Sequence, residues 1–255
     1  MAKPCICTTI TINADNKWLD IDHNSAGETS VEILMGTYAS IFALADQIEA
    51  ELQAHVDANY TCSVMTTGLA GRIQIHHLTH DFDALWKNGT HGTLGFDTSI
   101  GNQIGFIATD DDSSTSGTLF SDYQATQAWF STMHPVSDTD DKREHIGSNP
   151  VRTLDGSRQK RLTVSTPRNR DVEFKNLPPE IMWTVDATAA NTNRDFETLW
   201  LTIVESEAFE YFPDQTASAA HETYYLKEPS DFTGNKQLYP ATELYDLKLS
   251  MARQE

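Results

Sequence analysis

Three histidines and an aspartate fall within six positions of the chain, at His76, His77, His80 and Asp81. Imidazole and carboxylate are ligands of Zn²⁺, so a metal site is the first hypothesis. The preceding residues, 72–75, alternate polar with β-branched side chains, which predicts a strand. On a strand His76 and His80 share one face about 13 Å apart, and His77 points to the other. We therefore expect no metal without ligands from elsewhere, and interpret these histidines as surface or subunit-interface groups that change charge near neutral pH.

The carboxylates offer two further candidates. Asp81 and Asp83 share one face of a strand, as a glycosidase pair requires, but a chain with 37 Asp and Glu contains such pairs by chance. Asp110, Asp111 and Asp112 suggest calcium, yet an EF-hand loop needs glycine at position 115 and glutamate at 121, where the chain has Thr115 and Ser121. We expect a solvated acidic loop there and no catalytic pair.

Motifs of common enzymes do not occur in the sequence. The Gly-x-Ser-x-Gly elbow, the phosphate-binding Gly-x-x-x-x-Gly-Lys and the Gly-x-Gly-x-x-Gly loop are all missing. His221-Glu222 lacks the second histidine of a zinc protease. Three cysteines are an odd number, and Cys5 and Cys7 are too close for ordinary disulfide geometry, which predicts reduced thiols. The sequence predicts no enzyme, no catalytic residues, no cofactor and no bound metal.

Charge is distributed unevenly along the 255 residues, which carry a net charge of −19. Residues 1–140 hold 4 Lys and Arg against 18 Asp and Glu, a net of −14, and residues 141–255 hold 14 against 19, a net of −5. Nine basic residues gather between 142 and 175 with a single aromatic, Phe174, so base stacking on nucleic acid is not expected. We predict instead either a solvated face or a subunit interface that faces the acidic half of a neighbouring copy. Its candidate residues are Arg158, Lys160, Arg161, Arg168 and Arg170.

Apolar runs of membrane-spanning length do not occur, and residues 1–12 lack the basic start and apolar core of a signal peptide. We expect a chain that is made in a cytoplasm and has no membrane partner.

The first half of the chain reads as strands around one helix. Residues 7–12, 17–22 and 30–34 alternate with a period of two, and a turn at 24–27 separates the last two runs. Apolar residues then recur every three or four positions over about 37–57, which predicts an amphipathic helix with Thr37 as its cap. Residues 60–67 and 72–80 flank a glycine-containing turn and predict a hairpin.

The second half repeats this pattern. Alternating runs predict strands at residues 161–166, 171–177, 180–187, 208–214, 221–228 and 244–252. Helical spacing over about 192–205 predicts a second amphipathic helix behind a capping sequence that begins at Thr192. The predicted fold is α+β, mostly antiparallel β-sheets with one amphipathic helix in each half. We place an N-terminal β-rich domain at 1–120 and a C-terminal one at 121–255.

Two groups of motifs resemble virion proteins of tailed bacteriophages. The first contains Gly36-Thr37-Tyr38 before a helix, the 60–78 hairpin, an aromatic segment at 82–86 and the triplet Leu94-Gly95-Phe96. The second contains residues 170–183, then 196–214, where a helical pattern precedes an aromatic-Pro-Asp stretch, and a final strand at 244–250. Together they cover about two thirds of the chain. The matching residues are apolar positions and glycine turns, so the resemblance transfers no catalytic or binding residue.

The resemblance implies a non-enzymatic structural subunit of a tail or baseplate, similar to distal-tail or tail-tip components. Its expected partners are copies of itself in a six-fold or three-fold ring and other virion tail proteins, with no specific nucleic acid. Its expected location is the virion tail, assembled in the host cytoplasm. Three alternatives stay open: a head-tail connector or neck protein; a carbohydrate- or receptor-binding β module, because 5 Trp and 8 Tyr on strands can stack on sugars; and, last, an enzyme.

Overall fold

The architecture is taken from a computed structural model of the chain. It describes residues 3–66, 70–125, 127–130, 135, 137–143, 151–152, 158–159, 168–177, 203, 208–217, 219–226, 235–238 and 243–253. Within these residues the strands pair antiparallel throughout, which confirms the expected mostly antiparallel architecture.

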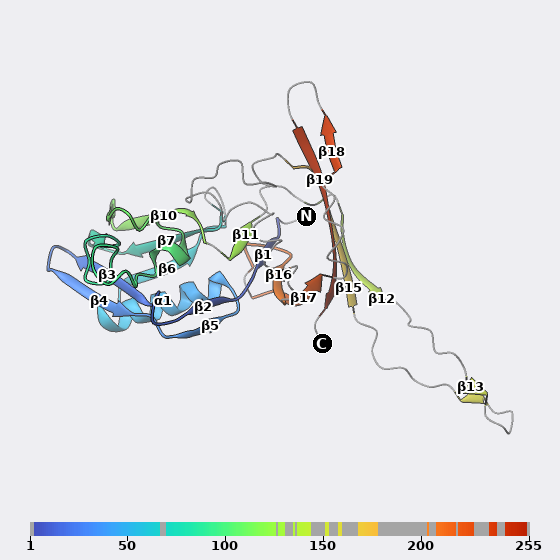
Figure 1. Cartoon of the computed structure of the whole chain (residues 1–255), viewed down its shortest axis with the longest axis horizontal. Helices are drawn as coiled ribbons and strands as arrows, with labels where there is room; N and C mark the ends of the chain where they lie inside the picture. The colour runs from blue at the N-terminus through green and yellow to red at the C-terminus, as the bar shows by residue number, and fades with distance from the viewer. Residues whose placement is uncertain are drawn as a thin grey trace.

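Three small sheets form the first body, which lies at the left of Figure 1. The first sheet has the order β4-β3-β8-β9, the second β10-β7-β6, and β2 pairs with β5. Their bounds are β2 Ile10–Ile12, β3 Trp18–His23, β4 Glu28–Glu32, β5 Gly36–Tyr38, β6 Tyr60–Val64, β7 Arg72–His77, β8 Phe82–Ala84, β9 Asp112–Ser113 and β10 Thr118–Gln124. The predicted hairpin is confirmed, because β6 pairs with β7 from Tyr60 opposite His77 to Val64 opposite Ile73. The predicted turn at 24–27 likewise joins β3 to β4.

One α-helix, α1 (Ile41–His55), covers these sheets. The predicted apolar stripe is confirmed in position, since Ile41, Leu44, Ala45, Ile48 and Leu52 are buried. The predicted cap is wrong. Ser40 is the N-cap, and its Oγ accepts a hydrogen bond from Ala43 N at 3.3 Å, whereas Thr37 lies in β5 opposite Thr11. Periodicity alone placed the start of the helix one turn too early.

An eight-stranded sheet dominates the second body and has the order β11-β1-β16-β17-β19-β15-β12, with β18 paired to β19. Its strands are β1 Cys5–Cys7, β11 Ala128–Phe130, β12 Ser137–Arg143, β15 Arg168–Leu177, β16 Phe209–Phe212, β17 Glu222–Leu226, β18 Asn235–Leu238 and β19 Glu243–Arg253. The predicted strands at 171–177, 208–214, 221–228 and 244–252 are confirmed in position, and those at 161–166 and 180–187 lie outside the described residues.

Strand β1 lies between the two hydrophobic cores and contributes side chains to both. Cys5 and Cys7 belong to the core of the first body, while Ile6, which points to the opposite face, belongs to the core of the second. Neighbouring β16 divides in the same way, with Phe212 in the first core and Tyr211 in the second. All three cysteines are free and buried, as expected. The domain boundary at residue 120 stays a prediction, although this pairing joins the N-terminal strand to a strand of the second body.

The expected helix in each half is wrong. In the part of the chain that the structure describes, α1 is the one α-helix with defined bounds, and Ile203 is a single further residue in helical conformation. The span predicted for the second helix, 192–205, lies outside the described residues except for Ile203. Apart from Ile203, strand residues such as Val172, Phe174 and Leu249 supply most of the described second core. The sequence pattern showed which positions are apolar but not which kind of element buries them.

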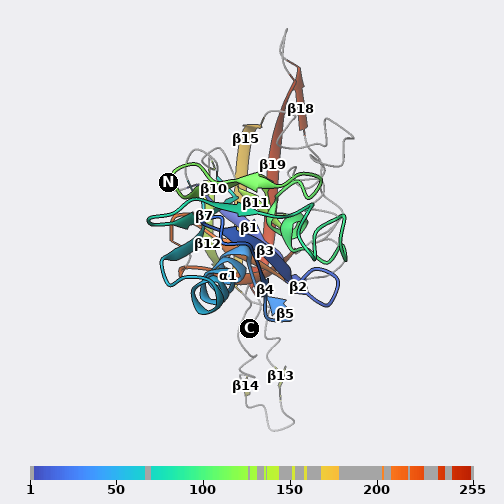
Figure 2. The same ribbon diagram turned by 90° about the vertical axis from the view of Figure 1, so that its left-hand side faces the viewer.

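Strands β12 and β15 pair at one edge of the eight-stranded sheet. Between them in sequence, β13 (Val151–Arg152) pairs with β14 (Arg158–Gln159), and this short hairpin lies apart from both bodies in Figures 1 and 2. The register places Arg152 opposite Arg158.

Candidate functional site

A cluster of histidines closes one end of the first body. His23 ends β3, Tyr60 begins β6, and His77 ends β7, so three strands bring these rings together. Ring centroids lie 4.7 Å apart for His23 and His77 and 4.7 Å apart for Tyr60 and His77. The chain bends after His77 instead of continuing as a strand, and the His80 ring then lies 5.4 Å from His77 and 5.5 Å from His23.

Alternation separates His76 from this cluster, as the sequence predicted. His77 is fully buried, whereas His76 Nδ1 lies 3.0 Å from the Gly117 carbonyl and 3.0 Å from Thr118 Oγ1 on the β10 side. The expectation that the strand runs on through His80 is wrong, because β7 ends at His77. Glycine at 117 permits this packing: a Cβ there would overlap the His77 carbonyl, and its φ is +68°.

Asp57, just after α1, supplies the carboxylate of the cluster. Its Oδ1 lies 3.5 Å from His77 Nε2, and the backbone N–H of Asn59 donates to the same oxygen at 2.9 Å. That backbone hydrogen bond is the main reason the pKa of Asp57 is lowered, and His77 adds to the effect. The pKa of His23 is also lowered, first by burial and then by the neighbouring His77. Among the described residues, His23, Asp57 and His77 are the group whose ligand atoms lie close enough to hold a metal ion, all within 4.8 Å of one another.

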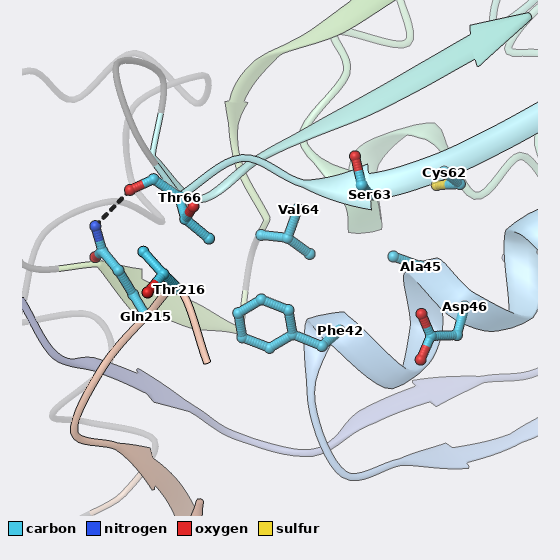
Figure 3. Close-up of a pocket in the computed structure, with 9 residues that line it drawn as sticks. All are labelled: Phe42, Ala45, Asp46, Cys62, Ser63, Val64, Thr66, Gln215 and Thr216. Atoms are coloured by element: carbon cyan, nitrogen blue, oxygen red, sulfur yellow. Dashed lines mark hydrogen bonds between the residues drawn. The ribbon is translucent and has the colours of Figure 1, made fainter. Parts of the chain in front are cut away.

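A second candidate is a pocket of about 220 Å³ between the two bodies, shown in Figure 3. Helix α1 and strand β6 form one side, and the turn after β16 forms the other. Gln215, from that turn, donates from Nε2 to the Thr66 carbonyl at 2.6 Å and closes one end. Burial raises the pKa of the Cys62 thiol, which is therefore protonated and a poor nucleophile. The lining residues are Phe42, Ala45, Asp46, Cys62, Ser63, Val64, Thr66, Gln215 and Thr216.

A third candidate is the surface loop of residues 85–98, which follows β8. Gly89, Gly92 and Gly95 each lie so close to other backbone carbonyls that a Cβ would overlap them. The loop is therefore tightly wound, with Phe96 N donating to Thr90 O and Asp97 N to Gly92 O, both at 3.0 Å. Its outermost side chains are large and apolar: Leu94 is 71% exposed and Phe96 is 72% exposed.

The acidic candidates from the sequence have structural roles. Asp81 accepts from Gly117 N at 2.7 Å, and its partner Asp83 lies in β8 opposite Ser113. Asp111 accepts from Lys87 N at 2.7 Å, and Asp112 accepts from the Trp86 indole at 3.0 Å. These bonds fasten the 85–98 loop to the residues before β10.

The interface residues are only partly described. Lys160 and Arg161 lie outside the described residues, and Arg158 and Arg168 are described as backbone in β14 and β15. Arg170 is 8% exposed, and its guanidinium lies 4.7 Å from the centre of the Tyr211 ring, so it contributes to the second core. The proposed interface as a whole stays a prediction.

The aromatic residues bear on the sugar-binding alternative. Trp86 and Trp129 are buried, and Trp18 is stacked on His91 with 4.1 Å between ring centroids. Trp183 and Trp200 lie outside the described residues.

Sequence reasoning missed the association of His23 and Asp57 with His77 and the exposure of Leu94 and Phe96. No local sequence pattern indicates the cluster, because its residues come from separate elements. No pattern indicates the exposure of Leu94 and Phe96 either, because residues of these types are usually buried.

Comparison with known proteins gives no match: no protein-family model, no curated protein and no solved structure matches this chain. Within the described residues, no helix is long and apolar enough to cross a membrane.

Proposed function

We propose that this chain is a non-enzymatic structural subunit of a phage virion that forms an oligomeric ring in the tail or baseplate. The observation that carries the proposal is the exposure of Leu94 and Phe96 on a rigid loop. These residues belong to the Leu94-Gly95-Phe96 triplet on which the resemblance to tail proteins partly rests. Phe96 contacts the His91 ring at 5.9 Å between centroids, but both apolar side chains stay mostly exposed, which is explained if they pack against a neighbouring subunit.

The rigidity of the loop favours a binding role over an incidental exposure. Asp20, which is 3% exposed, accepts from His91 N at 2.6 Å and lies 2.9 Å from His91 Nδ1. Asp111 and Asp112 hold the start of the loop at Lys87 and Trp86, and Asp20 holds its middle. Side chains on a preorganised loop lose little entropy when they bind, which is typical of interface anchor residues.

The β13–β14 hairpin is a second observation that supports the proposed assembly into a ring. A two-stranded hairpin alone is marginally stable in water, so one that lies apart from both bodies needs another surface. The hairpin belongs to the basic stretch of residues 142–175, and residues 1–140 of a second copy, with a net charge of −14, offer a complementary acidic surface.

Native mass spectrometry with negative-stain imaging tests the proposal. We expect a closed ring whose mass is a multiple of 28.5 kDa. A chain that stays monomeric at all concentrations would contradict the proposal.

Charge reversal tests the hairpin contact separately. Replacement of Arg158, Lys160 and Arg161 by Glu is expected to abolish assembly in light scattering at low salt. The control is the reversal of Lys248, which lies in β19, outside the basic stretch, and is exposed. Rings that persist in the triple variant would rule out this contact.

A further inference from the structure

We propose that His23, Asp57, His77 and His80 form a binding site for one divalent transition-metal ion of the Zn²⁺ type. The proposal does not depend on the assembly role, because the site lies where β3 and β7 end and β6 begins, away from the 85–98 loop residues Leu94 and Phe96. It rests on the three-residue cluster whose ligand atoms lie within 4.8 Å of one another and on a buried nitrogen that has no hydrogen-bond partner.

That nitrogen is His77 Nε2. The residue is 0% exposed, and the atom has no hydrogen-bond partner. Leaving a buried polar atom unpaired costs stability, so such an atom calls for an explanation. Asp57 Oδ1 lies 3.5 Å from this nitrogen, which is long for a hydrogen bond.

The same 3.5 Å suits two ligands of one ion. Zinc binds imidazole nitrogen and carboxylate oxygen at about 2.0–2.2 Å, and two ligands of a tetrahedral ion at that distance are roughly 3.3–3.6 Å apart. His77 Nε2 and Asp57 Oδ1 are therefore already spaced as ligands. His23 completes the cluster, and the Tyr60 hydroxyl, 2.9 Å from His23 Nδ1, orients its ring.

The turn after β7 determines how the ion is bound. His77 Nδ1 accepts from the backbone N–H groups of Thr79 at 3.3 Å and His80 at 3.0 Å. Acceptance at Nδ1 places the proton of the neutral ring on Nε2, which must lose it to bind a metal. Transfer of that proton to Nδ1 breaks both backbone bonds and frees the turn that carries His80.

His80 is therefore the fourth ligand we assign. Its ring centroid already lies 5.4 Å from His77 and 5.5 Å from His23, and the released turn lets it approach the ion. Access is from the Asp57 side, because that side chain is 31% exposed. Three imidazoles and one carboxylate are a ligand set typical of Zn²⁺ and Co²⁺.

Metal titration of the full chain tests the site. After removal of metals with a chelator, ZnCl₂ is added and the stoichiometry is read by native mass spectrometry. CoCl₂ is then used as a spectroscopic probe, because tetrahedral and octahedral Co²⁺ differ strongly in visible absorption. We expect one ion per chain, a tetrahedral Co²⁺ spectrum and a thermal midpoint that rises with Zn²⁺.

Variants identify the ligands. His23→Gln, Asp57→Asn and His80→Gln are each expected to weaken binding at least tenfold and to remove the rise in thermal midpoint. His55→Gln is the matched control, since its side chain is 58% exposed and contacts Glu51 outside the cluster. Circular dichroism checks that each variant is folded. Absence of a tetrahedral spectrum, or binding unchanged in His23→Gln and Asp57→Asn, would overturn the site, and binding unchanged in His80→Gln would overturn the fourth ligand.

Discussion

Asp20 and His91 are joined by two hydrogen bonds: Asp20 accepts from the backbone N–H of His91 at 2.6 Å and its other oxygen lies 2.9 Å from His91 Nδ1. One carboxylate on β3 thus fixes the centre of the 85–98 loop. We predict that Asp20→Ala lowers the free energy of unfolding by about 1–3 kcal/mol, because it leaves the part-buried N–H of His91 unpaired. Hydrogen exchange at the His91 amide measures the local effect directly. Unchanged protection of that amide would show that the pair does not hold the loop.

Gly95 and Gly36 both belong to the motifs on which the proposed resemblance rests, but they differ in their surroundings. A Cβ at Gly95 would overlap the Thr90 carbonyl, whereas one at Gly36 meets nothing within 4 Å. We predict that Gly95→Ala destabilises the chain by roughly 1–3 kcal/mol and that Gly36→Ala changes stability by less than about 0.5 kcal/mol. Thermal or chemical unfolding of the two variants measures the difference, and equal stability would contradict the tight winding of the loop.

Asp111 and Asp112 are expected to respond oppositely to pH. Burial raises the pKa of Asp111, but hydrogen bonds from Asn88 and Lys87 outweigh it and hold that pKa below its usual value. Its stabilising contribution is therefore present above about pH 4 and is lost as the pH falls further. Burial, followed by the charge of Asp122, raises the pKa of Asp112, so its contribution is present at low pH and is lost as the pH rises through the raised pKa.

Two substitutions separate these effects. At pH 7, Asp111→Asn is expected to cost about 1 kcal/mol after allowance for solvent screening, and the cost shrinks below pH 4. Asp112→Asn keeps an oxygen for the Trp86 indole and is expected to be neutral or slightly stabilising at pH 7. Unfolding curves of both variants at pH 3 and pH 7 measure this, and a larger loss for Asp112→Asn at pH 7 would contradict the assignment.

The start of α1 gives a prediction with a built-in control. Ser40→Ala removes the side chain that caps Ala43 N and is expected to cost about 1 kcal/mol. Thr37→Ala, in exposed β5, is expected to change stability by less than about 0.5 kcal/mol. Denaturant unfolding compares the two, and the reverse order would restore Thr37 as the cap.

Local pattern predicted the local parts of this fold. The β6–β7 hairpin, the β3–β4 hairpin and the buried stripe of α1 each follow from residues that are neighbours in sequence. The pairing of Cys5 with Phe212 has no such signal, because alternation shows that a strand exists but not which strand it meets. The expectation of one helix in each half failed because strands supply most of the core that the structure describes in the second half.

The candidate sites show the same limit. Strand alternation correctly predicted that His76 and His77 lie on opposite faces. The predicted continuation of the strand to His80 was wrong, because β7 ends at His77. His23 and Asp57 come from other elements and lie close to His77 in the fold, although they are distant from it in sequence. The bend after His77 also places His80 near this group. Leu94 and Phe96 are apolar, and only the fold shows that their own chain leaves them exposed.

The most direct measurement of the central proposal is the mass of the assembled protein with Leu94 and Phe96 both replaced by Gln. Light scattering coupled to size-exclusion chromatography is run on the natural chain, on the double variant and on Leu34→Gln, a control that is 62% exposed. We predict rings for the natural chain and for the control, and a folded monomer for the double variant. Rings of unchanged mass in the double variant would contradict the assignment of the 85–98 loop as the subunit contact.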